Sequence, residues 1–327
     1  MIIYDPIIHN LQSHGGITVY FNNLLSGCKV NNVEHLILTE RLKKYQRYFD
    51  LPLSSQLNSH KNVFHSSYYR LPSQQDINVV TTVHDFTYEK FVTGIPLAVH
   101  SWQKNRAVRN SDINICVSHN TAKDLQEFVG ISEDRIRVVH NGVSENYFLL
   151  ESESRMATSK VVFIGARKGY KNFEMAVKAL SSFSDLELAI VGGGELDEGE
   201  LKLLHSYLPN RFEWLGKLDD SELNILYNNA FCLFYPSSYE GFGIPVIEAM
   251  RAGCPVVAVD SSSIPEVGGN AALLARSADV DEFRTLIDRL FVAQERTRLQ
   301  ALGLEQSAKF SWDRCFQETL AVYAELI

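Results

Sequence analysis

The stretch from Phe231 to Asp260 constrains the fold of this chain most. It begins with the apolar run 231–235 and ends with the apolar run 255–259, and a glycine-rich turn and a helical pattern lie between them. Two short apolar runs joined through a helix are typical of parallel strands in a sheet that is covered on both faces. The sequence therefore predicts an α/β protein built on doubly wound parallel sheets.

The turn inside this stretch predicts an anion-binding site. Its glycines let the backbone approach a ligand closely, and Pro245 suits the first position of a helix, where the missing N–H costs nothing. A helix that begins there directs free N–H groups and its positive dipole end at the turn. Glu240 precedes this helix and Glu248 lies within it. Because carboxylates accept hydrogen bonds from hydroxyls, a ligand with both phosphate and hydroxyl groups is indicated, and a nucleotide sugar fits.

The same residues resemble a known signature. The sequence Glu240-Gly241-Phe242-Gly243-Ile244-Pro245, followed by Glu248, resembles that of glycosyltransferase family 4, whose members are retaining enzymes of the GT-B fold. The alternative reading of the two glutamates is a charge at a helix N-terminus and a solvated helix position. The resemblance implies two doubly wound Rossmann-like domains that face a central cleft.

Composition excludes several other classes of protein. A chain of 327 residues suits two domains, and its net charge of -8 argues against a general nucleic-acid binder. The five cysteines are odd in number and lie far apart, which favours reduced thiols in a cytoplasmic protein. There is no signal-peptide pattern, no run long enough to span a membrane and no Cys/His spacing typical of a metal site. We expect no metal and no cofactor.

The strand and helix alternation starts again after a polar stretch at 144–159, which predicts a domain boundary there. We expect an N-terminal domain at 1–150 and a C-terminal domain at 151–311. The resemblance implies that the first faces the acceptor and the second binds the nucleotide sugar. It also implies that a last helix, 312–327, returns to the first domain.

Two places in the N-terminal half are candidate sites. Gly15 and Gly16 follow an expected strand at 2–8; alone they indicate a tight turn, but the resemblance places them facing the donor diphosphate. His84 and Asp85 follow an expected strand at 78–83, at the edge where parallel sheets bind ligands. The alternative for this pair is a strand cap, whereas the resemblance places it near the acceptor and the donor sugar.

A basic and aromatic segment at 41–49 is a third candidate. It contains the cations Arg41, Lys43, Lys44 and Arg47 and the aromatic residues Tyr45, Tyr48 and Phe49. Such a segment suits an anionic membrane surface or a lipid-linked pyrophosphate acceptor. The alternative is an ordinary solvated helix face, because four charges are few for lipid recognition.

A basic glycine loop at 165–172 opens the C-terminal half. It follows an expected strand and precedes a helix, so cations in it would stabilise a leaving diphosphate. The resemblance assigns this role to an Arg and a Lys, and we choose Arg167 and Lys171. Lys168 competes for the role, and a solvated basic loop is the alternative.

The resemblance implies a complete reaction. A hexose, with GDP-mannose as the expected donor, would pass to a hydroxyl of a polyprenyl-diphosphate-linked oligosaccharide in the synthesis of O antigen or capsule, at the inner face of the plasma membrane. Glu240 would hold the sugar, Glu248 the ribose and His84 the sugar or the acceptor. The remaining donor-binding residues are expected to be Gly15, Gly16, Arg167, Lys171, Gly241, Phe242, Gly243 and Ile244.

Two other classes of function stay open. One is another enzyme of the same fold, such as a nucleotide-sugar epimerase or a phosphorylase. The other is a non-catalytic nucleotide-sugar-binding subunit of a polysaccharide assembly complex. In such a subunit we expect Glu240 or Arg167 to be replaced by another residue type, and neither is. No DxD-type metal motif follows a strand, so we expect transfer to proceed without a divalent metal.

Overall fold

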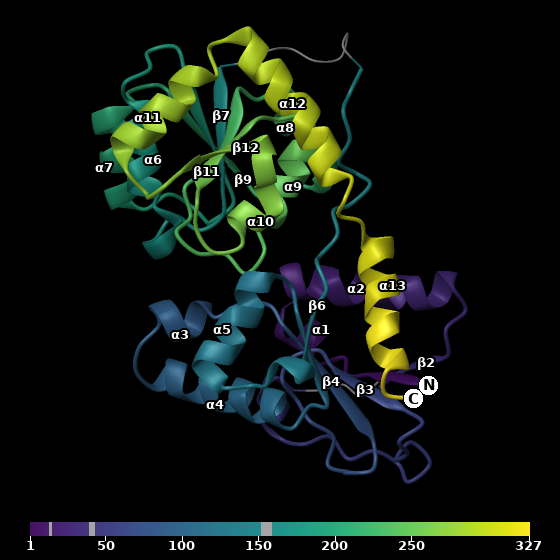
Figure 1. Cartoon of the computed structure of the whole chain (residues 1–327). Coiled ribbons are helices and arrows are strands. Elements are labelled where there is room, and N and C mark those ends of the chain that lie inside the picture. Colours follow the sequence, from purple (N-terminus) through teal and green to yellow (C-terminus); the bar gives the residue numbers. More distant parts are fainter. Residues whose placement is uncertain (13–14, 39–42, 152–158) are drawn as a thin grey trace. The chain divides into compact units, whose positions relative to one another are not determined.

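The computed structural model describes residues 1–12, 15–38, 43–151 and 159–327 (Figure 1). Contacts between Cα atoms divide the chain into two compact units. Unit 1 comprises Met1–Gly142 together with Trp312–Ile327, and unit 2 comprises Val143–Ser311. Each unit is built on one six-stranded sheet in which the paired strands are parallel.

The sheet of unit 1 has the strand order β2-β1-β3-β4-β5-β6. Its strands are β1 (Ile2–Tyr4), β2 (His35–Ile37), β3 (Val63–Ser66), β4 (Asn78–Val83), β5 (Ile113–Cys116) and β6 (Ile136–Val138). Its helices are α1 (Ile7–Leu11), α2 (Gly16–Val30), α3 (Thr87–Phe91), α4 (Ile95–Arg109), α5 (His119–Val129) and α13 (Trp312–Ala324), and short 3-10 turns lie at Lys44–Tyr48 and Glu133–Arg135.

Helix α13 packs beside α2 in the core of unit 1, as Figure 1 shows. Phe316 of α13 is buried against Gly27 of α2, where a Cβ atom would lie 2.5 Å from the phenyl ring. The hydroxyl of Tyr323 contacts Nδ1 of His65 and the hydroxyl of Tyr4. Residues from the two ends of the described chain therefore share one core.

The sheet of unit 2 has the strand order β12-β11-β10-β7-β8-β9. Its strands are β7 (Lys160–Ile164), β8 (Glu187–Val191), β9 (Phe212–Gly216), β10 (Cys232–Tyr235), β11 (Val256–Val259) and β12 (Ala272–Ala275). Its helices are α6 (Phe173–Leu180), α7 (Glu198–Tyr207), α8 (Asp220–Asn229), α9 (Ile244–Arg251), α10 (Ile264–Gly268), α11 (Val280–Arg289) and α12 (Ala293–Ser307), with 3-10 turns at Gly169–Lys171 and Gly269–Ala271.

Side-chain caps fix the start of several helices where the sequence indicates them. The Ser118 hydroxyl accepts the N–H of Thr121 at the start of α5. At the start of α8, Asp219 and Glu222 accept each other's backbone N–H groups, as the spacing of an acidic pair three residues apart predicts from the sequence.

The structure also corrects some expected elements. The first strand ends at Tyr4 rather than at residue 8, because Asp5 accepts the N–H of Ile7 and the chain turns into α1. The sequence predicts a loop at 91–96, but α3 ends at Phe91 and α4 already begins at Ile95, so the connection is only the three residues 92–94. Helices α7 and α10 were not expected. Among the described residues, no helix combines the length and apolar character needed to cross a membrane.

Candidate functional site

Three loops of unit 2 meet at the carboxyl ends of the neighbouring strands β7, β10 and β11. The N–H of Ser238 donates to the carbonyl of Tyr170 at 2.8 Å, so the loop after β10 lies on the loop after β7. The Ser261 hydroxyl donates to the carbonyl of Ser238 at 2.6 Å, and the N–H of Glu240 donates to the hydroxyl of Ser262 at 2.9 Å. This is the edge of a parallel sheet where ligands bind.

Lys171 and Glu240 form an ion pair at this edge. Nζ of Lys171 lies 2.5 Å from a carboxylate oxygen of Glu240 and 3.3 Å from the hydroxyl of Tyr235, and both charged side chains are 13% exposed. Burial, reinforced by the Glu240 carboxylate, raises the pKa of Tyr235 well above its usual value, so this hydroxyl stays protonated. The pair presents a cation and a hydrogen-bond acceptor side by side.

Arg167 lies in the same loop as Lys171 but contacts other groups. Its guanidinium donates to the carbonyls of Gly192, Gly194 and Glu195 at 2.8 to 3.0 Å and pairs with Glu200 at 3.0 Å. Arg167 is buried, and it ties the loop after β7 to the glycine loop after β8. Its expected contact with a diphosphate stays a prediction.

The competing cation, Lys168, lies on the surface. Its side chain is 80% exposed and pairs with Asp197 at 3.0 Å. Among the three cations of this loop, Lys171 is the one in contact with Glu240.

Helix α9 begins at the predicted glycine turn. Gly243 is its N-cap with φ 105°, has no side chain to cap the helix, and lies so close to Ile264 that a Cβ atom would be 2.7 Å from that side chain. The hydroxyl of Ser263 donates to the carbonyls of Glu240 and Phe242, which holds the turn in shape. The N-terminus of α9 therefore lacks a side-chain cap and lies next to the Glu240 turn.

Glu248 lies on α9 in a cluster with Tyr147 and Asp220. The Tyr147 hydroxyl donates to Asp220 at 3.2 Å and also bonds the Glu248 carboxylate. Desolvation raises the pKa of Glu248 to about 8; the Asp220 carboxylate adds to the rise, and the hydrogen bond from Tyr147 opposes it. Sequence reasoning missed Tyr147 and Asp220, because neither belongs to the glutamate motif.

The two candidates in unit 1 at the end of β4 differ in their surroundings. The ring of His84 packs edge-on against Tyr20 of α2, and its buried Nε2 has no partner. Desolvation lowers the pKa of His84 to about 4, so the imidazole is neutral at pH 7. Asp85 instead accepts the N–H of Thr87 at the start of α3, and its carbonyl accepts from Lys104. His84 thus keeps an unused polar atom, whereas Asp85 contacts α3 and α4. The expected contacts of both residues with the acceptor stay predictions.

The remaining expected residues of unit 1 lie at α2 and at the basic segment. Gly15 is the N-cap of α2, and a Cβ atom on Gly16 would meet nothing within 4 Å. Arg41 lies outside the described residues. Four residues of the segment, Lys44, Tyr45, Arg47 and Tyr48, line a pocket of about 470 Å³ together with Ile8, Leu11, Gln12 and Tyr68.

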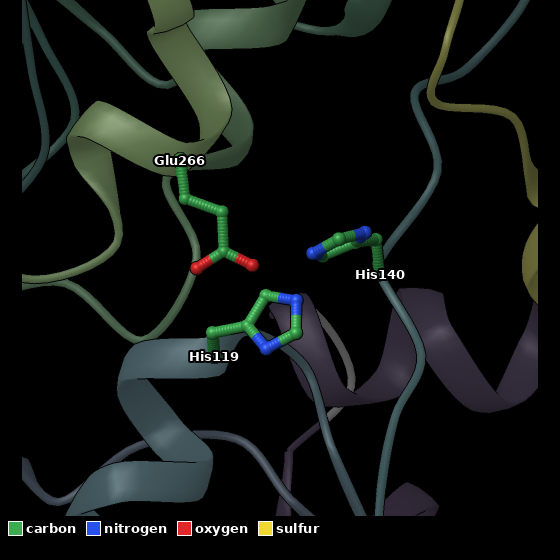
Figure 2. A group of neighbouring side chains, drawn as sticks. All are labelled: His119, His140 and Glu266. Carbon is green, nitrogen blue, oxygen red and sulfur yellow. The ribbon is translucent and has the colours of Figure 1, made fainter.

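Two histidines of unit 1 were not singled out in the sequence. His119 follows β5 and His140 follows β6, and these strands are neighbours in the sheet. Their rings meet edge to face with centroids 5.9 Å apart (Figure 2). Their positions just after consecutive parallel strands were the signal that could have found them.

Comparison with known proteins adds to this geometry. Residues 36–147 match the domain described as Glycosyltransferase Family 4, and residues 151–301 match Glycosyl transferases group 1. The O-antigen chain mannosyltransferase B of Escherichia coli is 32% identical over 197 residues, which are 60% of this chain and 44% of that protein. The MMP alpha-(1->4)-mannosyltransferase of Mycolicibacterium hassiacum is 31% identical over 233 residues, which are 68% of this chain and 56% of that protein.

The chain thus spans about half the length of these curated relatives. Among solved structures, sucrose-phosphate synthase from Thermosynechococcus elongatus superposes with a TM-score of 0.79 at 17% identity, over 99% of this chain and 98% of that one. This likeness shows the fold, with its two parallel α/β sheets. From the two matched domains and the fold together, the chain belongs to glycosyltransferase family 4 and has the GT-B fold.

Proposed function

We propose that this protein is a retaining hexosyltransferase that uses a nucleoside diphosphate sugar as donor. The observation that carries the proposal is the Lys171–Glu240 ion pair beside the N-terminus of α9, which has no side-chain cap. A cation and a helix N-terminus suit a diphosphate, and a carboxylate beside them suits sugar hydroxyls. Glu248 on the same helix supplies a second acceptor, which we assign to the ribose.

In this proposal the chemistry depends on stabilising the leaving group. Negative charge grows on the diphosphate as the bond to the sugar breaks. Lys171 and the dipole of α9 would stabilise that charge in place, so transfer proceeds without a divalent metal. His84, neutral and with an unused Nε2, is assigned to the sugar or the acceptor hydroxyl. Full activity lost in EDTA and restored by a metal would contradict the metal-free step.

The relatives favour mannose as the transferred sugar. Both are named mannosyltransferases, and one is named for the O-antigen chain. We therefore propose GDP-mannose as the donor and a lipid-linked saccharide of surface polysaccharide synthesis as the acceptor. Anomer-resolved NMR of the product would test retention of configuration.

The first experiment measures thermal stabilisation by GDP, UDP, ADP, dTDP and their sugars. A ligand present at a hundred times its dissociation constant stabilises the native state by about 2.7 kcal/mol, so a bound nucleotide raises the melting temperature measurably. We expect nucleotides with one of these bases to raise the melting temperature and the others to leave it unchanged. Lys171→Met should lose the shift because it removes the cation at Glu240, and Glu248→Gln should reduce it.

Lys178→Met is the matched control for Lys171→Met. Lys178 lies on α6 of the same unit and pairs with Glu174 near the surface, so its removal should leave the nucleotide shift unchanged. If no nucleotide stabilises the wild-type protein, or if the Lys171 and Lys178 variants respond alike, the donor site is not where we place it.

A further inference from the structure

An apolar ridge lies on the surface of unit 1. It consists of Phe91 at the end of α3 and Ile95, Val99 and Trp102 on α4, whose exposed fractions are 46, 79, 38 and 55%. The three residues of α4 follow one another at helical spacing, so they lie on one face of the helix. The opposite face carries the buried residues Gln103, Lys104, Ala107 and Val108. Helix α4 thus buries one side in unit 1 and exposes apolar side chains on the other.

Helix α3 holds its end of the ridge against α4. Lys104 pairs with Glu89 at 2.6 Å, and the Ser101 hydroxyl donates to the same carboxylate at 2.9 Å. The rings of Tyr88 and His100 stack with centroids 4.0 Å apart. The ridge is therefore part of a packed two-helix surface and not a loose loop.

The basic segment adjoins this surface. The Gln103 side chain of α4 donates to the carbonyl of Arg47 at 2.8 Å, and Arg106 pairs with Asp50 at 2.6 Å. Lys43 and Lys44 are exposed, and so are the rings of Tyr45 and Phe49. The exposed rings and cations of this segment continue the surface that the ridge begins.

The charge of this surface is opposite to that of the whole chain. Residues 43–50 and 87–109 contain seven Lys and Arg but two Asp and Glu, whereas the whole chain has a net charge of -8. Of the seven cations, Lys104 is buried and Lys90 pairs with Asp124, so the positive charge at the surface comes from the other five. Both acidic residues, Asp50 and Glu89, are in ion pairs with residues of α4. The surface therefore combines exposed apolar side chains with a positive rim.

We propose that this surface docks unit 1 on an anionic lipid bilayer. The four ridge residues enter the boundary between head groups and acyl chains, and Lys43 and Lys44 lie over lipid phosphates. The sequence alone predicts a membrane contact at 41–49. In the present proposal α3 and α4 provide the apolar contact, and the segment 41–49 provides positive charge. A second copy of the chain is a poorer occupant, because a symmetric pairing would bring two positive rims together.

The test measures binding of the full chain to phosphatidylglycerol vesicles and to phosphatidylcholine vesicles by co-sedimentation, with no nucleotide present. We expect binding to phosphatidylglycerol that weakens as salt is added. The double variant Ile95→Ser, Trp102→Ser should lower the partition coefficient at least about tenfold, because it removes two apolar anchors. The control Ile225→Ser, Val292→Ser changes two residues of unit 2 that are 51 and 53% exposed, and it should bind as the wild type does.

A second readout is specific to the ridge. Of the three tryptophans, Trp102 should be quenched by brominated lipid, and Trp102→Phe should abolish that quenching while vesicle binding persists. Equal binding of the ridge variant and the control would overturn the proposal. So would a ridge variant that dissociates an oligomer, measured by light scattering, without any loss of vesicle binding. Because no nucleotide is used, neither result depends on the donor site.

Discussion

At the residue scale, the Tyr147 hydroxyl bonds both Glu248 and Asp220. The Tyr147 hydroxyl lowers the pKa of Glu248, and the Asp220 carboxylate raises it. If the ribose hydroxyls donate to this group, the nucleotide binds the ionised carboxylate and its binding releases a proton. Because the pKa of Glu248 is about 8, nucleotide affinity should rise with pH up to about 8 and then level off.

Two substitutions should shift this pH dependence in opposite directions. Asp220→Asn removes a like charge, which lowers the pKa of Glu248 and raises nucleotide affinity at pH 7. Tyr147→Phe removes a hydrogen-bond donor, which raises that pKa and lowers the affinity. A change of one unit in the pKa of Glu248 changes the nucleotide affinity up to about tenfold, when the pH lies below this pKa in both the wild type and the variant. Calorimetric titration of each variant between pH 6 and 9, with the nucleoside diphosphate that gave the thermal shift, measures the two affinities. If both substitutions changed the affinity in the same direction, Glu248 would not be the group that binds the ribose.

The sequence predicts some of these residues for a physical reason. Glu240 and Glu248 are close in the chain, so a local pattern places them at one turn and one helix. Their partners are distant: Lys171 is 69 residues from Glu240, and Tyr147 is 73 residues from Asp220. Only the tertiary packing of the strands brings these groups together, and for that reason Tyr147 and Asp220 were missed.

At the element scale, the loops after β7 and β8 are joined through Arg167 and Gly193. A Cβ atom on Gly193 would lie 2.4 Å from the Arg167 guanidinium and 2.6 Å from the carbonyl of Gly165, whereas one on Gly194 would meet nothing within 4 Å. Both glycines have positive φ, 73° and 79°, so alanine strains the backbone at either position.

The two glycines therefore make a matched pair. Gly194→Ala should cost about 1 kcal/mol of unfolding free energy through backbone strain alone. Gly193→Ala carries the same strain and also pushes Arg167 and the loop apart, so it should cost about 1 to 3 kcal/mol more. Urea denaturation measures both values. If the two substitutions lower the unfolding free energy equally, Arg167 moves aside without loss of stability, and the two loops are not coupled.

The accuracy of the predicted elements depended on local signals. The strand at 78–83 was predicted with its observed bounds because five of its six residues are β-branched valines and threonines, which favour strands. Helix α7 was missed although Asp197 and Glu200 form a capping box at its start, a pattern that the sequence does contain. Helix α10 has five residues, too few for a periodic pattern to show.

At the scale of the whole molecule, unit 1 draws its core from both ends of the described chain. Gly27→Ala would ordinarily stabilise a helix by about 1 kcal/mol. Here the new methyl group would lie 2.5 Å from the ring of Phe316 on α13, so we expect this substitution to destabilise the protein instead.

A double-mutant cycle tests the contact between α2 and α13. Phe316→Leu alone leaves a cavity and should cost about 1 to 2 kcal/mol. Combined with Gly27→Ala, the smaller leucine makes room for the methyl group, so the double variant should be more stable than the sum of the single changes predicts. Additive free energies of unfolding would show that the two helices do not share this contact.

The position of α13 in unit 1 has a consequence during synthesis. When Gly142 leaves the ribosome, the strands of unit 1 have been made, but Trp312 and the rest of α13 follow only after all of unit 2. At about 5 to 20 residues per second, this delay lasts on the order of ten seconds or more. During that time the residues of unit 1 that bury Phe316 and Tyr323 lack their cover, so the nascent chain exposes apolar surface that the finished protein buries.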